Sequence, residues 1–246
     1  MKDLTVYYFS THPYSNEELK NSYFTEIISD AENVNAAYAR KEKNNEKNQI
    51  KNCPAFRHHF KNTFSFKSLY DYSFSINREN ETTHSNDYDQ DFFDHIFITR
   101  DIRSGLVSIK LNYLHIIPEE PVEVSQIHPT LGKGELAKHS NIVPGTFNPY
   151  HHPRPIESAF WLSKDKYNIK QNDDLFYLKF HTNKKINLKR IHLDKDIIRL
   201  MTNFSYKRNY TKSIFSLSKW YELGKRMNTS KRILSIIKEK KLEAKE

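Results

Sequence analysis

The chain has 246 residues, enough for one sizeable core, and 13% of them are aromatic. Only five residues are glycine, and the phosphate-binding patterns GxGxxG and GxxxxGK[ST] are absent, which disfavours nucleotide binding through those loops. The net charge of +9 is uneven, because residues 184–246 hold 18 Lys and Arg against 6 Asp and Glu, whereas residues 1–183 hold 21 against 24. Any electrostatic attraction to an anionic partner is therefore expected from the C-terminal quarter.

Cysteine usage and hydropathy restrict the class of protein further. The single cysteine, Cys53, excludes an internal disulfide and a cysteine-based zinc site. No run approaches the roughly 18 apolar residues of a membrane helix, and the N-terminal residues lack the apolar core of a signal peptide. We therefore expect a soluble protein of a reducing compartment, and no cofactor is predicted.

Short apolar runs separated by turn residues predict strands along most of the chain. The N-terminal segment, residues 1–52, starts with the β-like run TVYYFS and ends in KEKNNEKNQIKN, which is typical of an exposed linker. Alternation of apolar and polar residues predicts two strands within residues 53–76 and one long strand over residues 104–117. The acid-rich residues 77–94 and the glycine-containing residues 130–149 are expected to be loops.

Four further strands are predicted in PVEVSQIHP, IESAFWL, DLFYLKFHT and INLKRIHL. The tight turn Thr182-Asn183-Lys184 between the last two predicts a hairpin. Together these strands predict a mainly β domain over residues 53–194, an antiparallel β-sandwich of jelly-roll type. From residue 195 onward the apolar spacing becomes helical, which predicts a basic α-helical appendage over residues 195–246.

Three motifs of the β region suggest a relationship. They are CPAFRHHFKNTFSFKSLYDYSF, RPIESAFWL and IKQNDDLFYLKFHTNKKINLKR. In these stretches, which span roughly residues 50–195, the chain resembles a family of uncharacterised proteins encoded by large tailed phages of marine bacteria. The resemblance implies a phage origin and a shared β-fold, and it assigns no catalytic residue.

The stretch FNPYHHPRPIESAFWL, residues 147–162, is a candidate metal site. A cupin-like site uses two histidines and a glutamate, and His151, His152 and Glu157 have a plausible spacing. Adjacent residues of a regular strand point to opposite faces, so both histidines could bind one metal only from a turn, which the neighbouring prolines favour. The competing interpretation, which the pattern favours, is a rigid turn that presents two solvated histidines.

Two other residues of the β region are candidates for chemistry. Arg154 stands between prolines at the entrance to a strand, where its guanidinium could clamp an anionic ligand through two hydrogen bonds. Cys53 could be a nucleophile beside His58 or His59, but its apolar surroundings favour a packed thiol.

The C-terminal appendage combines cations with aromatic residues. The candidate binding residues are Trp220, Tyr221, Lys225, Arg226, Lys231 and Arg232. In this hypothesis the four cations attract an anionic partner and the two aromatic side chains form the contact surface, as in proteins that bind single-stranded nucleic acid. Alternatively, amphipathic helices dock on the sandwich and their lysines serve solubility; a protein-partner interface would have the same pattern.

These patterns favour a non-catalytic accessory or binding protein of a phage. We expect it to engage a host or virion protein, or nucleic acid, through residues 195–246, in the host cytoplasm or in the virion. A small-molecule or metal-dependent enzyme with a cupin-like site at His151, His152 and Glu157 is the first alternative. A virion structural component is the second, although the sequence contains no repeat or coiled-coil heptad.

Overall fold

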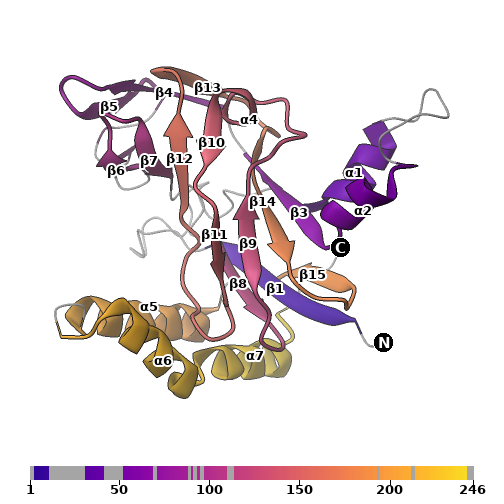
Figure 1. The fold of residues 1–246 in the computed structure, drawn as a ribbon. Helices are drawn as coiled ribbons and strands as arrows, with labels where there is room; N and C mark the ends of the chain where they lie inside the picture. The colour runs from indigo at the N-terminus through magenta and orange to yellow at the C-terminus, as the bar shows by residue number, and fades with distance from the viewer. Residues whose placement is uncertain are drawn as a thin grey trace.

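The computed structural model describes residues 3–10, 31–41, 52–68, 71–87, 90, 93–94, 97–109, 114–192, 194–211 and 214–242. These residues form mainly β-strands, which are arranged in four sheets, and the chain then continues into three successive helices (Figure 1). The prediction of a mainly β chain with antiparallel sheets and C-terminal helices is confirmed.

A three-stranded sheet lies between the main core and the C-terminal helices. Its central strand, β1 (Leu4–Ser10), pairs in parallel with β15 (Ile186–Arg190) and antiparallel with β8 (Leu114–Pro118). One face of β1 packs into the main core, and Tyr7 and Phe9 on its other face pack against the helices. A strand that is buried on both faces has a continuous apolar run, which is the pattern of this segment.

A five-stranded antiparallel sheet forms the largest layer. In spatial order its strands are β11 (Gly145–Phe147), β9 (Val124–Ile127), β14 (Asp174–Phe180), β3 (Thr63–Lys67) and β2 (Glu32–Asn33). The short helices α1 (Val34–Lys41) and α2 (Pro54–His59) lie beside β3 (Figure 1), where Val34, Phe60 and Tyr177 form a small apolar cluster.

Two smaller antiparallel sheets complete the β part. One has the order β10 (Ser140–Ile142), β12 (Ser158–Leu162), β7 (Leu106–Ile109) and β6 (Phe97–Asp101). The other has the order β13 (Lys166–Ile169), β4 (Tyr72–Asn77) and β5 (Thr82–Ser85). The helix α4 (Glu135–His139) packs against β10, β13 and β14.

The main core is rich in aromatic side chains, and all four sheets contribute to it. Phe66 stacks on Phe176 with 5.5 Å between ring centroids, and Phe74 stacks on Tyr167 at 5.2 Å. Such ring pairs bury a large apolar area and contribute about 0.5–1.5 kcal/mol beyond it. The aromatic content of the sequence therefore stabilises the packing between neighbouring strands.

The C-terminal helices α5 (Lys195–Thr211), α6 (Leu217–Met227) and α7 (Thr229–Lys240) lie below the sheets in Figure 1. We call these three helices the helical layer. Helices α5 and α7 bury one apolar stripe each against Tyr7, Phe9 and Ile117 of the three-stranded sheet. The buried side chains of the two stripes are Ile197, Met201, Ile233, Leu234 and Ile237. The helices are thus docked on the β part and do not extend away from it.

Three expectations of local structure are wrong. The strand predicted over residues 104–117 is divided, because β7 and β8 belong to different sheets. The predicted hairpin of β14 and β15 does not form, because β14 pairs with β3 and β9 while β15 pairs with β1. Two segments that were expected to be loops contain regular elements: residues 77–94 contain β5, and residues 130–149 contain α4, β10 and β11. Local alternation reports which faces are buried, and it does not specify the partner strand.

Candidate functional site

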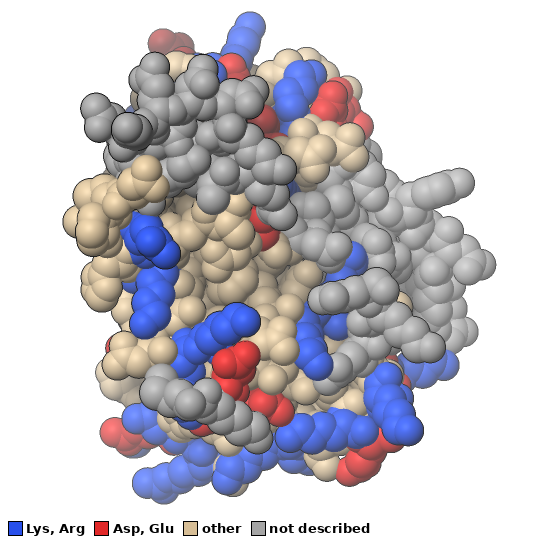
Figure 2. Space-filling view, turned by 90° about the vertical axis from the view of Figure 1, so that its right-hand side faces the viewer, with Lys and Arg blue, Asp and Glu red and all other residues tan. Residues whose placement is uncertain are grey.

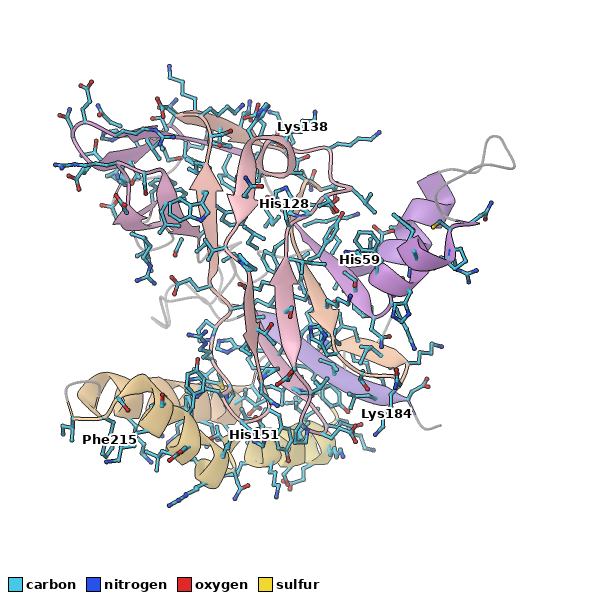
Figure 3. All side chains as sticks on the ribbon, viewed as in Figure 1. His59, His128, Lys138, His151, Lys184 and Phe215 are labelled. Carbon is cyan, nitrogen blue, oxygen red and sulfur yellow. The ribbon has the colours of Figure 1, made fainter. Side chains whose placement is uncertain are left out.

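The stretch that contains His151 and His152 is a turn at the lower ends of the strands, beside the helical layer (Figure 3). The side-chain oxygen of Asn148 accepts hydrogen bonds from the backbone amides of Tyr150 (3.1 Å) and His151 (3.3 Å). The amide of His152 donates to the carbonyl oxygen of Asn148 (3.1 Å). These local bonds are typical of an asparagine-initiated turn, so the backbone conformation follows from the sequence.

His152 is buried among aromatic side chains of the helical layer. Its ring centroid lies 4.4 Å from that of Tyr221, 5.3 Å from Phe204 and 6.3 Å from Trp220. The expectation of two solvated histidines is therefore wrong for His152, which is only 2% exposed. Its imidazole connects the loop to α5 and α6.

Gly224 brings α6 close to the same loop. A Cβ atom at this position would lie 2.8 Å from the carbonyl oxygen of His151 and 3.2 Å from Nδ1 of His152. Real Cβ atoms essentially never approach backbone within 3.0 Å, so the contact depends on the absence of a side chain. The loop of residues 148–152 is thus a docking site for α6.

The structure does not group His151, His152 and Glu157, the three residues of the alternative cupin-like site, as a metal site requires. Glu157 forms an ion pair with Arg100 of β6, while His152 is enclosed by the rings of the helical layer. In the part of the chain that the structure describes, no three His, Cys, Asp or Glu side chains are grouped so that they could hold a metal ion. The loop turns the two histidines toward helices and not toward a barrel interior.

His151 is half-buried and adds little positive charge near neutral pH. Burial lowers the pKa of its imidazole, and the charge of Lys225 lowers this pKa further. The neutral form is therefore favoured at the contact with α6.

The aromatic half of the predicted contact surface is wrong for Trp220. This side chain is 3% exposed and packs on Phe204 with 5.4 Å between ring centroids, and Tyr221 is half-buried against His152. The apolar stripe of α6 points to the β part because burying an indole is more favourable than leaving it in water. The four basic candidates are exposed: Lys225, Arg226, Lys231 and Arg232.

The helical layer carries a large excess of positive charge. Residues 195–241 contain 13 Lys and Arg and 3 Asp and Glu. Lys238 pairs with Glu119 at 3.2 Å, and Lys240 pairs with both Asp194 (2.9 Å) and Asp196 (2.7 Å), hydrogen bonds that raise the pKa of Lys240. Figure 2 shows Lys and Arg side chains gathered along the lower edge of the molecule, where the helical layer lies.

Helix α5 contributes a polar stripe with two cations, which the sequence interpretation left out. Arg199, Asn203 and Lys207 lie about one turn apart on this helix and line a groove of about 970 Å³ that α7 borders on its other side. The spacing of these residues at i, i+4 and i+8, beside the buried Ile197 and Met201, was the signal that could have identified the stripe.

Arg154 remains a candidate for anion binding. It is half-buried between Pro153 and Pro155, in a segment without regular secondary structure. Among the described residues, none forms an ion pair or hydrogen bond with its guanidinium. Its role as an anion clamp stays a prediction.

Cys53 is exposed, so the prediction of a packed thiol is wrong. The residue immediately precedes α2, and residues 54–59 form a helix instead of continuing an apolar strand. Pro54 at the start of this helix suits the first turn, where a backbone donor is not needed.

Comparison of the chain with protein-family models, curated protein sequences and solved structures finds no match. No family is assigned to the chain. The resemblance to phage proteins therefore stays a prediction. No helix of the described residues is both long and apolar enough to cross a membrane.

Proposed function

We propose that this chain is a non-catalytic binding protein that engages an acidic protein partner through the helical layer. The observation that carries the proposal is the orientation of these helices, which bury their apolar and aromatic stripes on the β part and expose their cations. So many like charges on one compact layer repel each other. A partner of opposite charge would relieve this repulsion and would be attracted over long distances.

A protein partner is favoured over nucleic acid by the state of the aromatic side chains. Single-stranded nucleic acid binds strongly where exposed aromatic rings stack on its bases, at about 1–3 kcal/mol per base. Of the aromatic side chains described in residues 195–241, Phe204 and Trp220 are buried, and Phe215 and Tyr221 are half-buried. The cations therefore lack a stacking platform among these residues.

The proposal includes the biological setting that the sequence motifs imply. The chain would be phage-encoded, its partner would be a host or virion protein, and it would act in the host cytoplasm or on the virion. The β part would be an antiparallel sandwich of jelly-roll type, which the convergence of all four sheets on one apolar cluster supports. A virion structural component is the competing role, and it predicts co-purification with particles.

The test compares charge reversal on the helical layer with the same change elsewhere. The helical variant replaces four exposed cations by glutamate: Lys225, Arg226, Lys231 and Arg232. The control variant does the same at four exposed cations of the β part: Lys61, Lys133, Lys138 and Lys166. Lys138 lies at the opposite end of the molecule from the helices (Figure 3), and both variants change the net charge equally.

Fluorescence anisotropy would measure binding of a labelled glutamate-rich peptide at about 50 and 200 mM salt. We expect the helical variant to lose at least about tenfold in affinity, or about 1.4 kcal/mol, and the control to lose much less. Equal losses in both variants, or no loss in the helical variant, would contradict the proposal. If a single-stranded thymidine oligonucleotide binds more tightly than the peptide, the partner is a nucleic acid and the proposal of an acidic protein partner is contradicted.

A further inference from the structure

The groove between α5 and α7 has the form of a binding site. It measures about 970 Å³, and Met227 of α6 also lines it. Half-buried Leu200, Met227 and Ile236 provide apolar surface within it, and Phe204 and Thr229 are buried beneath. The groove uses faces of the two helices that lie beside, and not within, the stripes docked on the β part.

The charges at the rim favour an acidic occupant. Arg199, Lys207 and Arg232 line the groove together with the carboxylates Asp196 and Glu239. Both carboxylates have partners within the layer, since Asp196 accepts from Lys240 (2.7 Å) and Glu239 accepts from the hydroxyl of Ser235 (2.6 Å).

Two exposed arginines line the groove, one on each helix. Arg199 and Arg232 are exposed, and no described residue forms an ion pair with either guanidinium. A guanidinium presents a planar set of donors that matches a carboxylate with two parallel hydrogen bonds. Two such groups on opposite helices would contact carboxylates on the two flanks of an occupant.

The dimensions suit a helix. Helix α5 has 17 residues and α7 has 12, which correspond to roughly 25 and 18 Å. An amphipathic helix lays apolar residues at i, i+3, i+4 and i+7 into such a groove, and flexible methionine helps the floor to adapt. The groove has an aliphatic floor and cations at its rim. These features together fit an occupant helix whose apolar stripe is flanked by carboxylates.

We propose that this groove receives an acidic amphipathic helix of the partner protein. The inference rests on the proposed function, because it places the contact of that function in one site. It differs from general charge attraction in that the order of residues in the partner helix matters, and not only its charge.

The probe is a labelled amphipathic peptide of about 14 residues, roughly 21 Å as a helix, built from Leu, Ala and Glu. A scrambled peptide of the same composition is its control. The groove variant carries Arg199→Glu and Arg232→Glu, and the matched control carries Lys195→Glu and Lys241→Glu, which are exposed positions outside the groove. Leu200→Gln tests the apolar floor, and circular dichroism checks that each variant is folded.

We expect the ordered peptide to bind about tenfold more tightly than the scrambled one. The groove variant should lose at least about tenfold and the matched control at most about threefold, and Leu200→Gln should weaken the ordered peptide only. Equal affinity for both peptides, with equal losses in both charge variants, would overturn the groove and leave the proposed function intact. Failure of every acidic probe would overturn both.

Two other occupants are distinguished in the same series. A single-stranded thymidine oligonucleotide is the first of these. If it binds more tightly than the peptide and its binding depends on the two arginines, the proposal of a helical protein partner is overturned. A concentration-dependent dimer in light scattering that the groove variant abolishes would show that a second copy of the chain occupies the groove, and it would also overturn the proposal.

Discussion

Replacing Gly224 by alanine is the sharpest test of how the helical layer is held. The substitution is in the interior of α6, where glycine is normally unfavourable. In an open helix position, Gly→Ala stabilises a protein by about 1 kcal/mol, because alanine loses less conformational entropy on folding. At Gly224 the structure predicts the opposite sign.

The magnitude follows from the contact with the loop. The added Cβ would lie 2.8 Å from the carbonyl oxygen of His151, so either α6 or the turn must move. Overpacking of a close contact costs about 1–3 kcal/mol. With the propensity gain of about 1 kcal/mol subtracted, we expect a net destabilisation on the order of 1 kcal/mol.

Urea denaturation would measure the free energy of unfolding of Gly224→Ala. A background with Trp161→Phe makes Trp220, which lies one turn before Gly224, the fluorescent reporter. Gly145→Ala is the control, because no atom beyond the glycine and its two chain neighbours lies within 4 Å of the added Cβ. Stabilisation of Gly224→Ala by about 1 kcal/mol would refute the docking of α6 on the loop.

The remaining predictions concern buried side chains. Trp220→Ala should cost about 3–5 kcal/mol in chemical denaturation, whereas Trp161→Ala, at a side chain that is 45% exposed, should change stability by less than about 1 kcal/mol. Burial lowers the pKa of His115 from 6.5 to about 3, so the unfolded chain binds the proton more readily and stability falls as pH drops below about 6.5. The loss should reach about 2 kcal/mol at a pH of about 5, and His115→Leu should remove this part of the pH dependence in urea titrations. Asp174→Ala should cost about 1–3 kcal/mol in thermal or urea unfolding, because the buried hydroxyl of Ser65 would lose its acceptor; an unchanged midpoint would contradict that.

Local pattern was sufficient where a segment's own residues determine its conformation. The alternation in residues 72–77 and 158–162 predicted β4 and β12, because each strand has one buried face. The apolar spacing after residue 195 predicted that this part is helical, because its helices bury one stripe each. The turn at residues 148–152 was also predictable, because Asn148 bonds to the amides that follow it.

The local sequence pattern failed to predict strand pairing, because the partner strand comes from a distant segment of the chain. The strand β1 pairs with β15, so Leu4 lies opposite Ile186, and no local signal indicates such a parallel partner. The long strand predicted over residues 104–117 divides because its two halves join different sheets.

For the candidate site too, one part could be predicted from the sequence and another part depended on the tertiary structure. The sequence by itself determined that the C-terminal quarter is basic, because charge is a property of composition and does not depend on the fold. Only the tertiary structure decided which of these residues are exposed. Burial of apolar surface turned Trp220 inward against His152, and so it left Lys225, Arg226 and the groove arginines facing the solvent.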